Sequence, residues 1–438
     1  MKLTFIANAC CLVESNKGTR IISDPWLDDG VFEGSWCHFH KLETTWDDIK
    51  SVDAVYVSHV HPDHFDERFF QFPKDTPMIV LDHGMNFLHK NLMKMGYTNL
   101  VKVKNHETVS FKDFKLTLFS PFTGHNFFEE NTKIGNLIDS GIVMEADNQK
   151  IFNANDNSPT PDACKSLKER FGVFDISMMN YNSAGSYPSC FNNLTDDEKV
   201  SEHINHLQRN IDYLYENLKI LNSKYFLPFA GTYVLGGKLS YKNAYLGTMT
   251  WDECIKMLNK KDSIQGTEYI ALNERTTFDL DFGAPDREYQ PIDKNEIEVY
   301  IKSTLSKMKY PYEFDEMPDK SQLEEDISKA VLAMNKRLER IKLVPDMCVS
   351  LEVNEKEIPI IEVPDSLSKG NLKCKMDLRL LRRILDRSSH WNNAEIGCHI
   401  EFTRTPNYYS PDMHTALQFF HLEQADYYTH SSGRPLSG

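Results

Sequence analysis

Four side chains that commonly bind metal ions lie within six consecutive positions of this chain. Residues 58–64 read SHVHPDH and directly follow a short apolar run. In an extended segment, residues i and i+2 point the same way, so His59 and His61 can bind one ion from one side. The proline after them is expected to turn the chain into the start of a helix, bringing Asp63 and His64 towards a second ion. Imidazoles and a carboxylate suit zinc, iron or manganese, and spacing alone does not choose among these metals.

Short apolar segments separated by turns must position these residues. We read residues 2–14 as a first buried strand. Further buried strands are expected at 52–57 and 78–81, and alternating apolar and polar residues predict hairpins over 109–118 and 141–152. Apolar residues spaced three and four apart predict a long helix over 198–221, followed by a strand at 225–229. Strand-rich halves with helices packed outside them are typical of an α/β sandwich.

The periodicity breaks near residues 284–294, where prolines and aspartates interrupt it. Beyond the break, a charged amphipathic helix, two short strands and a further helix predict a smaller α+β domain. We therefore expect a metal-binding catalytic domain over 1–285 and a C-terminal α+β domain over 292–425, whose role the sequence does not indicate. Residues 426–438 are expected to form a flexible tail.

Composition restricts the classes of partner. The 438 residues include 49 Lys and Arg against 64 Asp and Glu, which gives 49 − 64 = −15 with neutral histidines. An acidic balance argues against a nucleic-acid or anionic-membrane binder, which needs a basic face. No apolar run approaches the roughly 18 residues of a membrane span. A small-molecule substrate is expected, and it can be anionic, because a bound metal reverses the field locally.

Cysteine usage bears on the compartment. Nine cysteines are spread along the chain, their number is odd, and no C-x-x-C occurs. This pattern argues against a disulfide framework or a cysteine-bound structural zinc, and it predicts a reducing, cytoplasmic setting. Because the apolar stretch at the N-terminus is shorter than the apolar core of a secretion signal, we do not expect one.

The H-x-H-x-D-H run resembles the signature of the metallo-β-lactamase superfamily, whose fold is an αββα sandwich. The resemblance implies a third histidine for the first metal, best matched by His125, and a bridging aspartate after a hairpin, matched by Asp156. Asp24, after the apolar run at 20–23, is expected to hydrogen-bond to metal ligands and orient them without binding the metal itself. The metal ligands implied by the resemblance are His59, His61, Asp63, His64, His125 and Asp156.

One feature departs from the superfamily pattern. The family usually adds a last histidine near the end of the domain, but the corresponding segment, 227–232, reads LPFAGT. The second site would then retain Asp63, His64 and Asp156, so either one or two divalent ions are expected.

Several segments resemble one branch of the superfamily more closely. DPWL at 24–27, GSW at 34–36, the histidine motif, AGSYP at 184–188 and PFAG at 228–231 occur in this order. The arrangement is similar to the metallo-β-lactamase-like domain of CMP-N-acetylneuraminate hydroxylase. That hydroxylase also carries a Rieske iron–sulfur domain, held by paired Cys and His motifs. Here CHFH at 37–40 lacks the spacing and the second motif, so no Rieske cluster is expected.

Three functions are compatible with these patterns. The favoured one is a metal-dependent hydrolase that uses metal-activated water on a polar, phosphorylated or sugar-nucleotide-like substrate, with Asp63 as the catalytic residue. The second is an iron-dependent oxygenase, which would need electrons from a redox partner or from the substrate. The third is a metal-clipped binding module. The patterns do not choose between zinc and iron, and they do not indicate the oligomeric state.

Four aromatic residues are candidates for the pocket wall or for core packing: Trp26, Trp36, Tyr181 and Tyr187.

Overall fold

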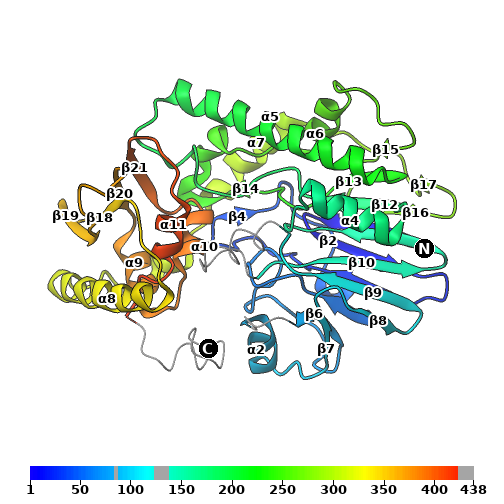
Figure 1. The fold of residues 1–438 in the computed structure, drawn as a ribbon, viewed down its shortest axis with the longest axis horizontal. Helices are drawn as coiled ribbons and strands as arrows, with labels where there is room; N and C mark the ends of the chain where they lie inside the picture. The colour runs from blue at the N-terminus through cyan, green and yellow to red at the C-terminus, as the bar shows by residue number, and fades with distance from the viewer. Residues whose placement is uncertain (83–86, 123–137, 423–438) are drawn as a thin grey trace.

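The computed structural model describes residues 1–82, 87–122 and 138–422. Two large β-sheets form the first part of the chain (Figure 1). The first sheet has the strand order β17 (Ala284–Pro285), β16 (Thr276–Asp279), β1 (Lys2–Ala7), β2 (Cys10–Glu14), β3 (Arg20–Ser23), β5 (Ala54–Tyr56), β6 (Met78–Asp82) and β7 (Leu100–Lys104). The second has the order β15 (Glu268–Tyr269), β13 (Tyr225–Pro228), β12 (Ile176–Met179), β11 (Gln149–Asn153), β10 (Gly141–Ala146), β9 (Phe114–Phe119) and β8 (Thr108–Phe111).

Central strands such as β3, β5 and β12 are buried on both faces because each sheet is covered on both sides. In β3, Ile21 faces a core shared by the two sheets, whereas Ile22 faces the outer side of the first sheet. The helices α1 (Trp46–Ile49) and α2 (Phe87–Lys94) cover that outer side. The outer side of the second sheet is covered by α4 (Pro161–Phe171), α5 (Asp196–Leu221) and α6 (Trp251–Leu258). This layering confirms the predicted αββα sandwich.

The long helix α5 confirms the helix expected from the apolar spacing. It begins two residues earlier than predicted, because Thr195 caps it by accepting a hydrogen bond from the backbone N–H of Glu198. The face that carries Ile211, Leu214 and Leu218 is buried against the second sheet.

The N-terminal segment differs from its prediction as a single strand. It is a hairpin, in which β1 and β2 pair in antiparallel register. Asn8 lies at the turn with φ of 48°, a left-handed conformation that asparagine tolerates better than most residues. The interruption of the apolar run therefore marks a reversal of the chain.

A four-stranded sheet forms the C-terminal part, with the order β19 (Lys356–Ile361), β18 (Cys348–Val353), β20 (Asn371–Lys375) and β21 (Glu401–Thr405). It is accompanied by α8 (Lys320–Ile341), α9 (Leu378–Asp386), α10 (Trp391–Ile396) and α11 (Pro411–Leu417). This confirms the predicted additional α+β part. Among the described helices, none combines the length and the apolar character that crossing a bilayer requires.

The two parts of the chain share a hydrophobic core. Trp36 and Tyr233 from the sandwich belong to the same buried cluster as Trp391 and Leu381 from the C-terminal part. Trp36 lies in β4 (Trp36–Cys37), which pairs with β14 (Val234–Leu235). Figure 1 shows α10 between the C-terminal sheet and this small ribbon. The connecting helix α7 (Lys294–Ser303) packs instead near Cys37, Phe39 and Val234.

Candidate metal site

The histidine motif lies where β5 leaves the middle of the first sheet. His59 follows this strand, His61 lies at a bend, and the chain then turns back at 62–64. The backbone N–H groups of His64 and Phe65 both donate to the carbonyl of His61, at 3.0 and 2.8 Å. The segment is a turn and not the predicted start of a helix, because the regular hydrogen-bond ladder does not continue beyond it.

A first group of candidate ligands contains His59, His61 and Asp139. His59 Nε2 lies 2.8 Å from His61 Nδ1 and 3.5 Å from Asp139 Oδ1. The sequence reading missed Asp139, which lies just before β10. An aspartate at a strand entrance is common as a turn residue, so its sequence context carries no signal for a ligand.

A second group contains His59, His64 and Asp156. Asp156 Oδ2 lies 3.4 Å from His64 Nε2 and 4.0 Å from His59 Nε2. Asp63 joins this group through its Oδ2, which lies 3.3 Å from His64 Nε2. The fold thus brings together five of the six ligands that the sequence predicts. The sixth, His125, lies outside the described residues.

Two histidines of the site, His59 and His64, differ in their electrostatics. Burial, together with the neighbouring His64 and His61, holds the pKa of His59 well below its usual value, so His59 is neutral. For His64, burial also favours the neutral form, but Asp63, Asp156 and Asp24 outweigh it and raise the pKa well above normal. Neutral imidazole is the form that binds a metal, and a cation can take the place of a proton among the carboxylates.

Asp24 and Ser58 contact the Nδ1 atoms of His64 and His59, on the side of each ring opposite Nε2. The sequence predicts such a supporting position for Asp24. The buried Asp24 places Oδ2 3.1 Å from His64 Nδ1, and its Oδ1 accepts the backbone N–H of Ser58 at 2.7 Å. The Ser58 hydroxyl lies 2.9 Å from His59 Nδ1 and 3.3 Å from His64 Nδ1. Such contacts orient the rings so that the opposite nitrogens face the candidate ion positions.

Asn8 is a further residue of the site that the sequence reading placed inside a strand. Its amide Nδ2 donates to Asp63 Oδ2 at 3.1 Å. Its Oδ1 accepts the backbone N–H groups of Gly231 and Thr232, at 2.7 and 3.0 Å. The segment in which the superfamily carries its last histidine therefore holds Asn8, which in turn holds Asp63.

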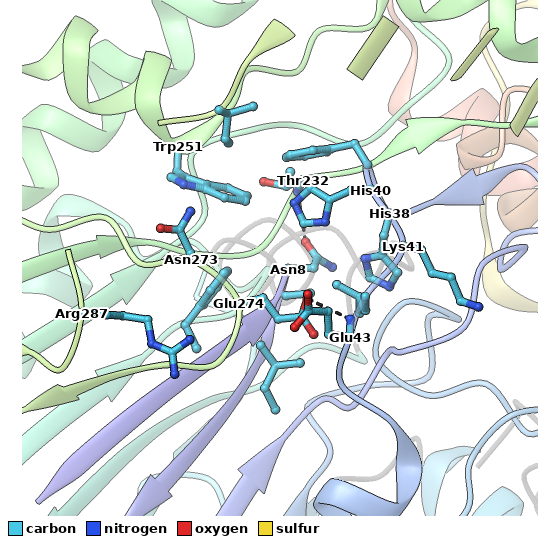
Figure 2. A pocket seen from close by; sticks show the side chains of 16 residues that line it. Asn8, His38, His40, Lys41, Glu43, Thr232, Trp251, Asn273, Glu274 and Arg287 are labelled. Carbon is cyan, nitrogen blue, oxygen red and sulfur yellow. Dashed lines mark hydrogen bonds between the residues drawn. The ribbon is translucent and has the colours of Figure 1, made fainter. Parts of the chain in front are cut away.

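Asn8 also lines a cavity of about 410 Å³. Figure 2 shows Asn8 beside Thr232 near its centre, with Lys41 and Arg287 at opposite sides. Trp251 provides an aromatic surface, and the volume is within the range of small-molecule pockets. Acidic groups, Glu43 and Glu274, accompany the two cations, so the lining carries charges of both signs.

The four aromatic candidates for the pocket wall are not among the residues that line this cavity. Trp26 and Trp36 are buried in the core, and Trp36 stacks on Tyr233 with ring centroids 3.4 Å apart. Tyr181 is also buried, with its hydroxyl against that of Thr232. Tyr187 is half-buried and donates to Glu202 at 2.9 Å.

The donor atoms present fit one or two divalent ions. In each group, the candidate ligand atoms lie within 4.8 Å of one another. Two ligand atoms that each bind one ion at about 2.0–2.2 Å lie no more than about twice that distance from each other, which is close to the separations in these groups. Imidazole nitrogens with carboxylate oxygens suit both zinc and iron, and neither group contains a cysteine that would favour zinc.

Part of this chain, including the histidine motif, is similar to known proteins. Residues 19–211 match the family model described as a beta-lactamase superfamily domain. A protein of Mycolicibacterium smegmatis named as a Rieske 2Fe-2S iron-sulfur protein is 30% identical over 53% of this chain and 43% of its own length. Cytidine monophosphate-N-acetylneuraminic acid hydroxylase of Danio rerio is 25% identical over 52% of this chain and 38% of its own length. The matched segment spans less than half of each of these relatives.

The crystal structure of CmlA, a diiron beta-hydroxylase from Streptomyces venezuelae, is similar with a TM-score of 0.44 at 17% identity. The similarity covers 63% of this chain and 53% of that chain. The family match spans β3 to α5 and includes the histidine motif and Asp156. Residues 19–211 of this chain are therefore similar to beta-lactamase superfamily domains.

Proposed function

We propose that the protein is a metal-dependent hydrolase that uses metal-activated water on a polar small molecule. The convergence of His59, His61 and His64 with Asp156 and Asp139 carries this proposal. When bound, a divalent ion lowers the pKa of its water to about 7 and so supplies hydroxide at neutral pH. The neutral, buried His59 belongs to both candidate groups and is the central donor.

Asp63 is the proposed catalytic residue. Its Oδ2 is held by the Asn8 amide and lies next to His64, so the carboxylate is fixed in direction. A carboxylate held in this way can orient water and accept its proton, and such general-base steps contribute about 10²- to 10⁴-fold. Asp24 and Ser58 keep His64 and His59 oriented while Asp63 acts.

The proposed substrate is polar, and a phosphorylated or sugar-nucleotide-like compound is compatible with the cavity. Lys41 and Arg287 can pair with anionic groups, and Trp251 can stack on a base or a sugar ring. Asn8 lines this cavity and also contacts Asp63. The cavity and the candidate ion positions are therefore neighbours.

An iron-dependent oxygenase is the second candidate. The absence of cysteine from the two donor groups of the described chain is compatible with iron. The similarity to a protein named as a hydroxylase also favours it. Electrons would then come from a redox partner or from the substrate.

Two measurements on the purified full chain distinguish these candidates. Protein purified without added metal is analysed for zinc, iron and manganese, and candidate phosphoesters and sugar nucleotides are then tested with and without oxygen. Bound zinc with turnover that is independent of oxygen supports the hydrolase and excludes the oxygenase. Two bound irons with no turnover under anaerobic conditions would exclude the hydrolase.

A further inference from the structure

A residue of the C-terminal part contacts the histidine motif directly. Asn392 Oδ1 lies 3.0 Å from His61 Nε2, although the two residues are 331 positions apart in the chain. Asn392 lies on α10, which belongs to the core shared by the two parts of the chain. The α+β part therefore reaches the candidate metal site.

This contact determines which nitrogen of His61 carries its proton. An amide oxygen can only accept a hydrogen bond, so His61 Nε2 must donate one. In a neutral imidazole, the other nitrogen then has a free lone pair. That nitrogen, Nδ1, is the atom that faces His59 Nε2 at 2.8 Å, in the first group of candidate ligands.

The segment around Asn392 is fixed by hydrogen bonds to the sandwich. The Ser389 hydroxyl donates to Glu33 at 2.7 Å, and the Ser35 hydroxyl donates to the carbonyl of Gly397 at 2.8 Å. His399 Nε2 donates to the carbonyl of Phe32 at 3.0 Å. The backbone N–H of Asn392 itself donates to His390 Nδ1 at 3.2 Å, which caps the start of α10.

We propose that Asn392 is a positioning residue for His61, through which the C-terminal part sets the metal affinity of the site. Its amide oxygen holds His61 in the Nε2–H tautomer, with Nδ1 directed at the ion. This inference rests on the metal binding in the proposed function. It gives the α+β part a role in the site, because the acceptor for His61 comes from that part and not from the sandwich.

The test measures metal affinity and not turnover. Zn²⁺ affinity is determined by competition with a chelator, and Co²⁺ binding by its visible absorption, for the full chain and three variants. Asn392→Leu removes the acceptor and is expected to weaken Zn²⁺ binding roughly 10- to 100-fold and to change the Co²⁺ spectrum. Asn392→Asp keeps an oxygen acceptor and is expected to remain within about threefold of the wild type in Zn²⁺ affinity.

Asn393→Leu is the matched control. Asn393 is the next residue of α10, is similarly half-buried, and makes no side-chain hydrogen bond among the described residues. Its variant is expected to bind Zn²⁺ like the wild type. Thermal unfolding of each variant shows whether the parts still pack together.

Three outcomes would overturn the inference. The first is an Asn392→Leu variant with unchanged Zn²⁺ affinity and an unchanged Co²⁺ spectrum. The second is an equal loss of affinity in Asn392→Leu and Asn392→Asp, because the acceptor would then be irrelevant. The third is a wild type that binds none of Zn²⁺, Co²⁺ and Fe²⁺, which would overturn the proposed function as well; the first two leave that function standing.

Discussion

The two sides of the candidate metal site are built from different chemistry. The sandwich side carries three histidines and several carboxylates, among them Asp63 and Asp156 around His64. On the C-terminal side, the contact with the histidine motif and two buried histidines nearby in the chain, His390 and His399, are neutral. Burial lowers the pKa of His390 well below normal and that of His399 to about 3, so both are uncharged at neutral pH. The contact to His61 comes from the amide of Asn392.

This difference separates two tasks. The charged side can bind ions and accept protons, because its groups can exchange a proton for a metal. The neutral side can orient a ligand without adding charge to a buried site, where an unpaired charge would be costly. Loss of a candidate ligand on the charged side is therefore expected to affect metal content and turnover most strongly, whereas on the neutral side only a residue that contacts a candidate ligand, such as Asn392, is expected to change metal affinity.

The largest effect is expected for His59→Ala. His59 belongs to both candidate ligand groups, so its loss should remove bound metal and lower turnover by at least about 10³-fold, because hydroxide at neutral pH depends on the ion. Metal analysis, circular dichroism and activity check this result. His106→Ala, at an exposed turn before β8, is the control. Full metal content and activity in His59→Ala would contradict the assignment.

A somewhat smaller effect is expected for Asp63→Asn. The amide keeps the shape of the side chain and can still accept from Asn8, but it cannot take a proton. Turnover should fall by about 10²- to 10⁴-fold, while metal bound through His59 and His61 is retained. Kinetics and metal analysis of the same preparation test this. A variant with turnover within threefold of wild type would show that Asp63 is not the base.

Two serine substitutions compare the sides directly. Ser58→Ala removes the hydroxyl next to His59 and His64 and is expected to weaken metal binding about tenfold or more. Ser389→Ala removes a hydroxyl that donates to Glu33 and contacts no candidate ligand, so its metal affinity should change less than about threefold. Chelator competition measures both. Equal losses in the two variants would remove the distinction between the sides.

The smallest effect on metal binding at neutral pH is expected for His399→Gln, which is tested through the free energy of unfolding. Because burial lowers the folded pKa of His399 to about 3, the unfolded chain, near 6.5, binds more protons between these values. The free energy of unfolding should therefore fall as the pH drops from about 6.5 towards 3, by up to about 1.4 kcal/mol per pH unit for this histidine. Denaturant unfolding at pH 7, 6 and 5 should show a shallower slope for the variant, which has no titrating group there. An identical slope would mean that His399 titrates alike in both states.

Much of the fold was predictable because its signals are local. Alternating apolar residues identify the hairpins that became β8–β9 and β10–β11, and three-four spacing identifies α5. Part of the negative charge counted in the sequence lies at the site, because the carboxylates of Asp24, Asp63 and Asp156 all lie next to His64. The hairpin at Asn8 was missed, because a left-handed residue between two apolar runs resembles a short interruption of one strand.

The sequence by itself determined the core of the site, since His59, His61, Asp63 and His64 lie on one loop whose strand and turn place them together. Only the tertiary structure decided that Asn8 holds Asp63, that Asp139 faces His59 and that Asn392 meets His61. The physical reason is separation along the chain. Periodicity and turn chemistry act over a few residues, whereas contacts between residues tens to hundreds of positions apart follow from how sheets and domains pack.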